Sequence, residues 1–322
     1  MKNRRLLKVG VALGSGGAKG WAHIGVLNAL ERMGIRPSIV AGTSIGALVG
    51  AAYACQRLDK LENWVLPMTW KDIIGYLDVS VKRGGLIEGD KLLEAIQQET
   101  CDDILIEETH KLFSAVATEL GSGQEIWLRE GSLLDAVRAS IAMPGLFTPV
   151  ERDGEWLTDG ALVNPVPVSL CRAMGADIVI AVNVNTDNYG RYDLDGMLSA
   201  PQQRVDLKND DHNGVSMWDR VSNQLVNSIQ DRKDMILSRI AWGDSHAPGM
   251  YEVFGRTINI MQDRIARSRL AGDPPDVLLT PYVHDIAVMD FHKAKQAIAE
   301  GESSVYRMRP ALEHLKQATQ QN

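Results

Sequence analysis

The chain has 322 residues, of which 45% are hydrophobic and 23% are charged, and its formal net charge is -7. This composition is typical of a globular protein with ample chain for a hydrophobic core. Its acidic balance argues against a nucleic-acid-binding surface, which needs clustered basic residues. Three widely separated cysteines, Cys55, Cys101 and Cys171, indicate neither a disulfide framework nor a metal site, and favour a reduced, cytoplasmic location.

The first eight residues are basic, as at the start of a signal peptide, but the apolar run that follows covers only residues 9–13 and contains Gly10. We therefore interpret residues 9–13 as the first strand. No stretch approaches the ~18 apolar residues of a membrane span. Any membrane contact is expected to be peripheral.

A glycine-rich loop, residues 14–20, follows this strand and leads into a helical pattern over residues 21–33. A dinucleotide fingerprint needs glycine at the sixth position, where Lys19 stands, and a Walker A loop needs Gly-Lys-Ser/Thr at its end. Both phosphate-binding interpretations fail on a defining residue. What remains is a group of backbone N–H donors at a helix N-terminus, suited to holding an oxyanion.

Residues 38–55 run from a β-branched stretch through Gly42, Ser44 and Gly46 into an Ala-rich helical stretch. A Gly-x-Ser-x-Gly pattern between a strand and a helix favours a turn so tight that the serine is strained, and the glycines remove Cβ atoms that would clash. The hydroxyl is then presented near a helix N-terminus, where developing negative charge is stabilised. An ordinary strand-to-helix connector is the alternative, and the setting favours Ser44 as a nucleophile.

The oxyanion loop follows the first strand and the serine turn follows the second. If these strands are adjacent and parallel, both features lie at one edge of the sheet, where open α/β sheets place their sites. The seven histidines include no obvious catalytic candidate, and we interpret His23 as a packing or hydrogen-bonding residue.

Further along, the patterns predict helices over residues 92–98 and 132–140, and a strand over 112–118 that pairs with 125–128 across the turn at 121–123. Residues 139–167 are rich in turn formers. Taken alone, Asp159-Gly160 indicates a hairpin turn.

Four motifs taken in order nevertheless resemble the patatin-like phospholipases, most of all the short bacterial members of the neuropathy target esterase branch. They are Gly-Ser-Gly-Gly-Ala-Lys-Gly (14–20), Gly-Thr-Ser-Ile-Gly (42–46), Ala-Ser-Ile-Ala-Met-Pro-Gly-Leu-Phe-Thr-Pro-Val (139–150), and Asp-Gly-Ala (159–161) with Asn164 and Pro165. The resemblance covers nearly the whole chain and is thinnest over residues 186–250.

This resemblance implies a three-layer α/β fold with a mainly parallel central sheet, and a serine hydrolase without metal or cofactor. It implies Ser44 as the nucleophile and Asp159 as its base. It places the oxyanion hole, mainly through the first two amides, at Gly16, Gly17, Ala18 and Lys19. The implied substrates are carboxyl esters of phospholipids or lysophospholipids.

Two conditions follow from this assignment. A carboxylate with a pKa of ~3.9 is a poor base towards a serine hydroxyl, so Asp159 must be desolvated to become more basic. Ala161 stands where many members have a second glycine, and we expect alanine to be tolerated there if its φ is negative.

After a predicted strand at residues 177–182, a polar stretch leads to amphipathic helical patterns at 217–240 and 250–270. We interpret residues 186–272 as a helical insertion into a single domain spanning residues 1–322. Its helices pack on the sheet or on another subunit, or, as a less favoured alternative, form a surface for lipid. The chain closes with a strand at 277–280 and helices at 290–300 and 302–319.

The sequence therefore predicts a patatin-like lipid acyl hydrolase that is cytoplasmic, with contact at the inner membrane left open. A homo-oligomer is also left open. The alternatives are a non-catalytic regulatory or scaffold protein that binds lipid or a partner, and an acyltransferase. No nucleic acid is expected as a partner.

Overall fold

The computed structural model describes residues 7–76, 89–99, 103–185 and 250–321. The chain divides into two compact units, residues 1–190 with 261–322, and residues 191–260. The predicted helix at 217–240 lies outside the described residues, so the proposed insertion stays a prediction. Among the described helices, none is long and apolar enough to cross a membrane.

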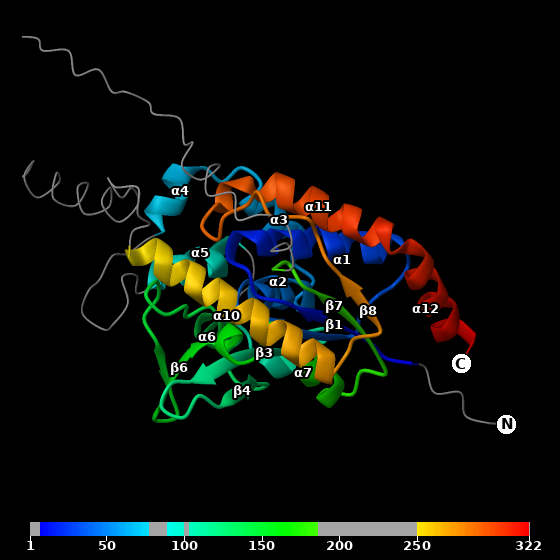
Figure 1. Cartoon of the computed structure of the whole chain (residues 1–322), viewed down its shortest axis with the longest axis horizontal. Helices are drawn as coiled ribbons and strands as arrows, with labels where there is room; N and C mark the ends of the chain where they lie inside the picture. Colours follow the sequence, from blue (N-terminus) through cyan, green and yellow to red (C-terminus); the bar gives the residue numbers. More distant parts are fainter. Residues whose placement is uncertain (1–6, 77–88, 100–102, 186–249, 322) are drawn as a thin grey trace, which may run out of the picture. The chain divides into compact units, whose positions relative to one another are not determined.

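An eight-stranded sheet organises the first unit (Figure 1). The strands are β1 (Val9–Leu13), β2 (Ile39–Thr43), β3 (Leu112–Glu119), β4 (Glu125–Leu128), β5 (Val150–Arg152), β6 (Glu155–Asp159), β7 (Ile178–Val182) and β8 (Val277–Leu279). Their order is β5-β6-β3-β2-β1-β7-β8, and β4 pairs with β3. The run β3-β2-β1-β7-β8 is parallel, whereas β4, β5 and β6 pair antiparallel. The mainly parallel sheet and the adjacency of β1 and β2 are confirmed.

The strands at the centre of the sheet are buried on both faces, as their continuous apolar runs require. Alternate residues of β1 enter different clusters: Val11 and Leu13 join one core, and Ala12 joins the other. Since successive side chains of a strand point to opposite faces, these two cores mark the two faces of the sheet.

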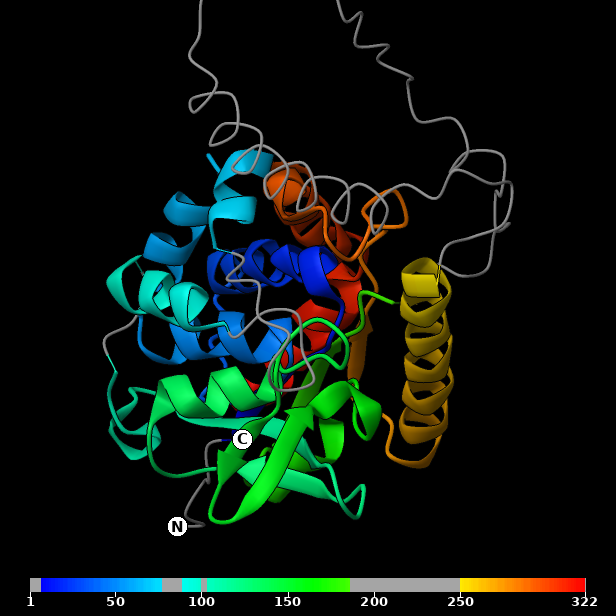
Figure 2. The same ribbon diagram turned by 90° about the vertical axis from the view of Figure 1, so that its left-hand side faces the viewer.

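Helices cover each face. The larger core is formed with α1 (Ala22–Arg32), α2 (Ile45–Ala54), α3 (Leu58–Val65), α6 (Leu133–Ser140), α11 (Ala294–Arg307) and α12 (Arg309–Gln321). The smaller core includes residues of α7 (Val168–Ala173) and Ala266 of α10 (Met250–Gly272), with Leu270 packed against it. In Figure 2 the C-terminal half of α10, in yellow, stands apart from the blue α1, α2 and α3. The other described α-helices are α4 (Trp70–Gly75) and α5 (Asp90–Glu99).

The predicted break between the last two helices at residue 301 is wrong. α11 runs through Gly301 to Arg307, and α12 starts at Arg309. A Cβ at Gly301 would overlap the carbonyl oxygen of Ala22, and one at Gly25 would overlap that of Ile298. Glycine therefore lets α1 and α11 approach closely, side by side in Figure 1, and does not end the helix.

Candidate active site

The turn after β2 has the strained form that its sequence predicts. Ser44 has φ 57° and ψ −126°, and α2 begins at the next residue. A Cβ at Gly42 would overlap the backbone of Ala47, and one at Gly46 would overlap the carbonyl oxygen of Leu13. The two glycines are therefore required by backbone contacts, and the turn holds Ser44 in a conformation that side chains rarely adopt.

Asp159 reaches Ser44 because β2 and β6 meet end to end along one edge of β3. Thr43, the last residue of β2, pairs with Val116, and Asp159, the last residue of β6, pairs with Ala117. β4 also pairs with these two positions of β3 and so occupies the opposite edge. The sheet thus brings together two side chains that are 115 positions apart in the sequence.

The Ser44 hydroxyl donates a hydrogen bond of 2.7 Å to Oδ2 of Asp159. The other carboxylate oxygen, Oδ1, accepts the N–H of Ala161 at 2.8 Å. Asp159 is only 1% exposed, and this burial raises its pKa from 3.8 to about 6, against the two hydrogen bonds that lower it. The desolvation that the chemistry requires is therefore present. Among the described residues other than glycine, a positive φ occurs at Ser44, Gln56 and Asp153. Ala161 therefore has the negative φ on which tolerance of alanine at this position depends.

The glycine-rich loop lies beside this pair. Gly17 has φ 56° and lines the same cavity as Ser44. Within the described part of the chain, the N–H groups of Gly16 and Gly17 have no hydrogen-bond acceptor. The N–H of Ala18, in contrast, donates to the carbonyl of Val288 at 2.8 Å. The structure therefore corrects the assignment of Ala18 as an oxyanion donor, while Lys19 lies inside the 3-10 turn η1 (Gly17–Trp21).

Next to Ser44 lies a cavity of about 110 Å³. Its walls are almost entirely apolar and come from helices α2, α3, α4 and α5, from the 3-10 turn η1 and from the segments that connect these elements. The lining residues include Leu48, Trp64, Met68, Ile73, Leu92, Ile141, Leu146, Phe147, Val288 and Phe291. A strained serine bonded to a buried carboxylate, two amides without an acceptor among the described residues and an apolar cavity thus share one site.

The comparisons with known proteins agree with this arrangement. Residues 11–172 match the family model described as patatin-like phospholipase. An uncharacterized NTE family protein of Mycobacterium tuberculosis, Rv1063c, is 33% identical to the chain over 331 residues, which are 92% of this chain and 89% of that protein. The chain belongs to the patatin-like phospholipase family. The four sequence motifs therefore identified the family correctly.

Other relatives of this patatin-like phospholipase are longer. Human patatin-like phospholipase domain-containing protein 6 is 33% identical over 187 residues, which cover 56% of this chain and 14% of that protein. The crystal structure of VipD from Legionella pneumophila aligns with 96% of this chain and 67% of that chain, at 12% identity and a TM-score of 0.46. The relatives named NTE are consistent with the bacterial branch that the motifs indicate.

Ser140 is a residue of the site that sequence reasoning missed. Its hydroxyl accepts the backbone N–H of Ser44 at 2.9 Å and donates to the carbonyl of Val116 at 2.6 Å. It therefore ties the strained serine to β3 at the point where β2 ends. The signal was its place in the 139–150 motif, which carried the resemblance without revealing this contact.

His23 supports the loop of this patatin-like phospholipase. It is completely buried, and burial lowers its pKa to about 4, so the ring is neutral at pH 7. Its Nε2 lies 2.7 Å from the carbonyl oxygen of Gly14, to which the protonated nitrogen donates. The hydrogen-bonding role predicted for His23 is confirmed. In the described part of the chain, no histidine is hydrogen-bonded to Ser44 or Asp159.

The described residues contain no cluster of metal-ligating side chains. Over residues 7–76, 89–99, 103–185 and 250–321, no group of three or more His, Cys, Asp or Glu side chains could hold a metal ion. The described cysteines, Cys55 and Cys171, are buried and form no disulfide.

Proposed function

We propose that this patatin-like phospholipase hydrolyses carboxyl esters of phospholipids or lysophospholipids, with Ser44 as nucleophile and Asp159 as base. The proposal rests above all on one observation, the 2.7 Å hydrogen bond between a strained serine and a buried carboxylate. Membership of the family implies lipid esterase activity in general. The proposal adds which two residues carry out the reaction.

Among the residues that the structure describes, the hydroxyl proton of Ser44 has one acceptor, Oδ2 of Asp159. As this proton moves to the carboxylate, Oγ attacks the acyl carbonyl carbon and forms a tetrahedral intermediate. Asp159 then returns the proton to the departing alcohol, and the acyl group stays on Ser44. Water then attacks the acyl carbon and gives a proton to Asp159, which passes it to Oγ of Ser44 as the bond to the acyl group breaks and the fatty acid leaves. A pKa of about 6 suits both directions, because the group is ionised at neutral pH yet basic enough to accept a proton.

The negative charge that develops on the carbonyl oxygen needs donors that are in place beforehand. The unpaired amides of Gly16 and Gly17 supply them, and each such donor is typically worth ~3–4 kcal/mol of barrier lowering. The carbonyl of Val288, which takes the Ala18 amide, fixes the direction of the loop.

The apolar cavity beside Ser44 accounts for the substrate class. Its lining residues, among them Leu48, Trp64 and Phe147, offer almost no hydrogen-bond partners to a polar acid or alcohol. A hydrocarbon chain bound there leaves its ester carbonyl at Ser44. Burial of each methylene stabilises the complex by ~0.8 kcal/mol.

The test is to incubate the purified protein with a lysophospholipid and a phospholipid in mixed micelles, and to measure the fatty acid released. We expect release by the wild type and none by Ser44→Ala, while Ser303→Ala, an exposed serine of α11, keeps full activity. Adding an acceptor alcohol separates hydrolysis from acyl transfer, since a transferase forms the new ester at the expense of free acid. Wild-type protein that is folded but releases no acid and forms no ester contradicts the proposal and favours a binding protein.

A further inference from the structure

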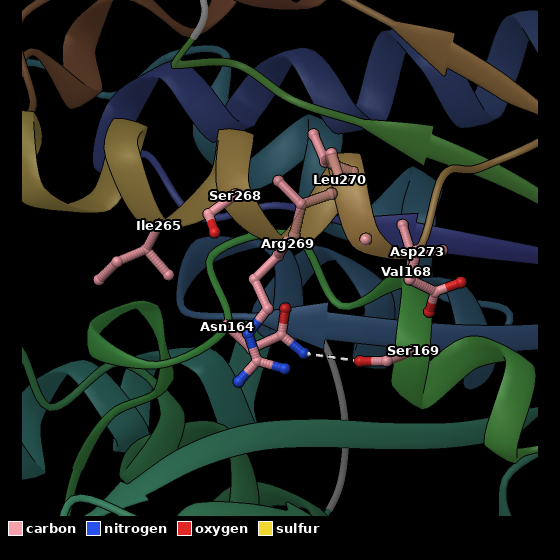
Figure 3. Close-up of a pocket in the computed structure, with 10 residues that line it drawn as sticks. Asn164, Val168, Ser169, Ile265, Ser268, Arg269, Leu270 and Asp273 are labelled. Carbon is pink, nitrogen blue, oxygen red and sulfur yellow. Dashed lines mark hydrogen bonds between the residues drawn. The ribbon is translucent and has the colours of Figure 1, made fainter.

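A second, larger cavity of about 340 Å³ lies away from the catalytic pair, within the range of ~300–1,000 Å³ that ligand pockets occupy. It opens between the C-terminal half of α10 and the start of α7 (Figure 3). The residues that line it are Asn164, Val166, Val168, Ser169, Ile265, Ser268, Arg269, Leu270, Gly272 and Asp273. Neither Ser44 nor Asp159 is among them, so the proposed chemistry does not use this cavity.

The lining is amphipathic. Val166, Val168, Ile265 and Leu270 provide apolar wall, whereas the polar groups come from both sides of the cavity. Figure 3 shows the side chain of Arg269 extending from α10 toward Asn164, with Ser169 hydrogen-bonded to that amide. Such a lining matches a molecule with an apolar body and one polar head.

The guanidinium of Arg269 is held in position for a ligand. Its Nη2 donates to Oε2 of Glu125 at 2.8 Å, and Oε1 of Glu125 accepts from Asn164 at 2.7 Å and from Trp127 at 2.6 Å. The Arg269 side chain is still 42% exposed, and its other N–H groups have no acceptor among the described residues. A fixed arginine with free N–H groups is the usual partner of carboxylates and phosphates.

The other end of the cavity is acidic, because two carboxylates share one guanidinium there. Asp273 lies 3.3 Å from Nε of Arg172, which also contacts Asp276 at 3.3 Å. The hydroxyl of Ser268, one residue before Arg269, has no hydrogen-bond partner among the described residues. Although Arg269 is paired with Glu125, the arginine end offers N–H donors and a hydroxyl to an anionic head, while the carboxylates at the other end disfavour it.

We propose that this cavity binds a single-chain amphiphile with an anionic head, the head on Arg269 and Ser268 and the chain along Val168, Ile265 and Leu270. If the proposed function holds, the fatty acid that the enzyme releases has this chemistry, and so does a lysolipid phosphate. A carboxylate head and a phosphate head would thus be bound by the same two residues.

Asn164 connects the cavity to the residues next to Ser44 and Asp159, so a bound ligand can affect that pair. The side chain of Asn164 lines the cavity, and its backbone carbonyl accepts the hydroxyl of Thr43 at 2.9 Å, immediately before Ser44. Its backbone N–H donates to Gly160, immediately after Asp159. A ligand that moves Asn164 therefore changes kcat more than KM.

Binding is measured by calorimetry on Ser44→Ala protein, which needs no turnover, with octanoate, octyl phosphate and uncharged octanol as probes. We expect at least one of the two anions to bind, at least tenfold tighter than octanol. Arg269→Gln is expected to weaken that anion at least tenfold, whereas Arg264→Gln, an exposed arginine of α10 that does not line the cavity, leaves it unchanged. The better of the two anions identifies the head.

Ser268→Trp is a second variant for the case in which Arg269→Gln lowers the melting temperature. It fills the cavity without removing the Arg269–Glu125 ion pair. Anion binding that survives both variants, or octanol binding as tightly as octanoate, overturns the proposal. Octanoate can also be tested as an inhibitor of wild-type hydrolysis. If it raises only KM, and does so in Ser268→Trp as well, it binds in the catalytic cavity, and the proposal is overturned. If the wild type has no hydrolytic activity, only the proposed function is contradicted. The binding proposal is still decided by the calorimetric result.

Discussion

The two glycine-rich turns of the site are built in different ways. In the serine turn, the backbone of Ala47 leaves no room for a side chain at Gly42, and the end of β1 leaves none at Gly46. Ala47 is close in the sequence, and β1 is the strand next to β2. In the oxyanion loop, a Cβ at Gly17 would overlap Val288, and one at Gly16 would overlap Val184, both more than a hundred residues away. The conformation of Ser44, the proposed nucleophile, thus depends on nearby backbone, whereas that of the proposed oxyanion donors depends on contacts distant in the sequence.

The site is therefore expected to respond to substitution in three different ways. Changes to the catalytic pair remove the chemistry and leave the fold intact. Changes to the loop weaken transition-state stabilisation in proportion to the donor that is lost. Changes to the glycines of the serine turn break the fold itself.

The largest effect is expected for the pair. Ser44→Ala and Asp159→Asn should each lower kcat by ~10³-fold or more, and the double variant should be little worse than either, because residues that act as a unit do not contribute additively. Steady-state kinetics on the three variants measures this. Independent losses that multiply in the double variant contradict a shared proton transfer.

Gly17→Ala tests the loop. Its φ of 56° and the carbonyl of Val288 both oppose a side chain, so the amide is displaced and kcat falls by ~10²–10³-fold, the usual value of one oxyanion donor. Gly154→Ala is the matched control, because Gly154 has φ 86° with nothing within 4 Å of its Cβ. It should cost ~1 kcal/mol of stability and no activity. Gly46→Ala should instead prevent folding, which circular dichroism will report.

Asp159→Asn should also stabilise the protein at neutral pH. The folded-state pKa of about 6 lies above the ordinary 3.8, so the carboxyl favours folding below pH 3.8 and this contribution is lost as the pH rises through 6. At ~1.4 kcal/mol for each pKa unit, the ionised carboxylate costs up to roughly 3 kcal/mol at pH 8. Unfolding curves at pH 8 and pH 3.5 measure the gain, which should vanish at the lower pH. An equal gain at both pH values argues against ionisation as the cause.

The pH profile of activity follows from the same group. Asp159 accepts a proton only when ionised, so kcat/KM should rise tenfold per pH unit below about 6 and level off above it. A soluble ester assayed from pH 4.5 to 8 gives this curve. A midpoint near 4 means that burial does not raise the pKa of Asp159 in solution.

The smallest effect is expected for His23. His23→Ala leaves the Gly14 carbonyl without its donor, loosens the start of the loop and should lower kcat by roughly tenfold, as loss of a neutral hydrogen bond does. His23→Gln keeps an N–H at a similar reach and should restore most of the loss. A fall of ~10³-fold in a folded variant would instead argue for a histidine in the chemistry.

Sequence reasoning recovered what is local. The strand, the glycines and the helix around Ser44 follow one another directly, and the structure reproduces them. Asp159 could not be found from its own surroundings, since Asp-Gly also indicates a hairpin turn, and only the family resemblance singled it out. Its place beside Ser44 depends on β6 pairing with β3 just beyond the end of β2, a register that no local pattern encodes.

The same limit explains the other errors. Ser140 was missed because its contact with the Ser44 amide crosses 96 positions. Ala18 was assigned as a donor because the sequence does not show that Val288 takes its N–H. The break at residue 301 was predicted where a glycine in fact permits close packing against α1.

The contact between Val288 and the loop has a consequence for how the protein is made. A ribosome adds residues at ~5–20 per second, N-terminus first. The serine turn at residue 44 is therefore outside the ribosome well before residue 288 has been translated, and the loop amides take their final directions only when that late segment docks. A nascent chain that has not yet reached residue 288 therefore has the serine turn but lacks the contact that fixes the loop. If the proposed function holds, hydrolytic activity begins only after this late segment has been made and has packed against the loop.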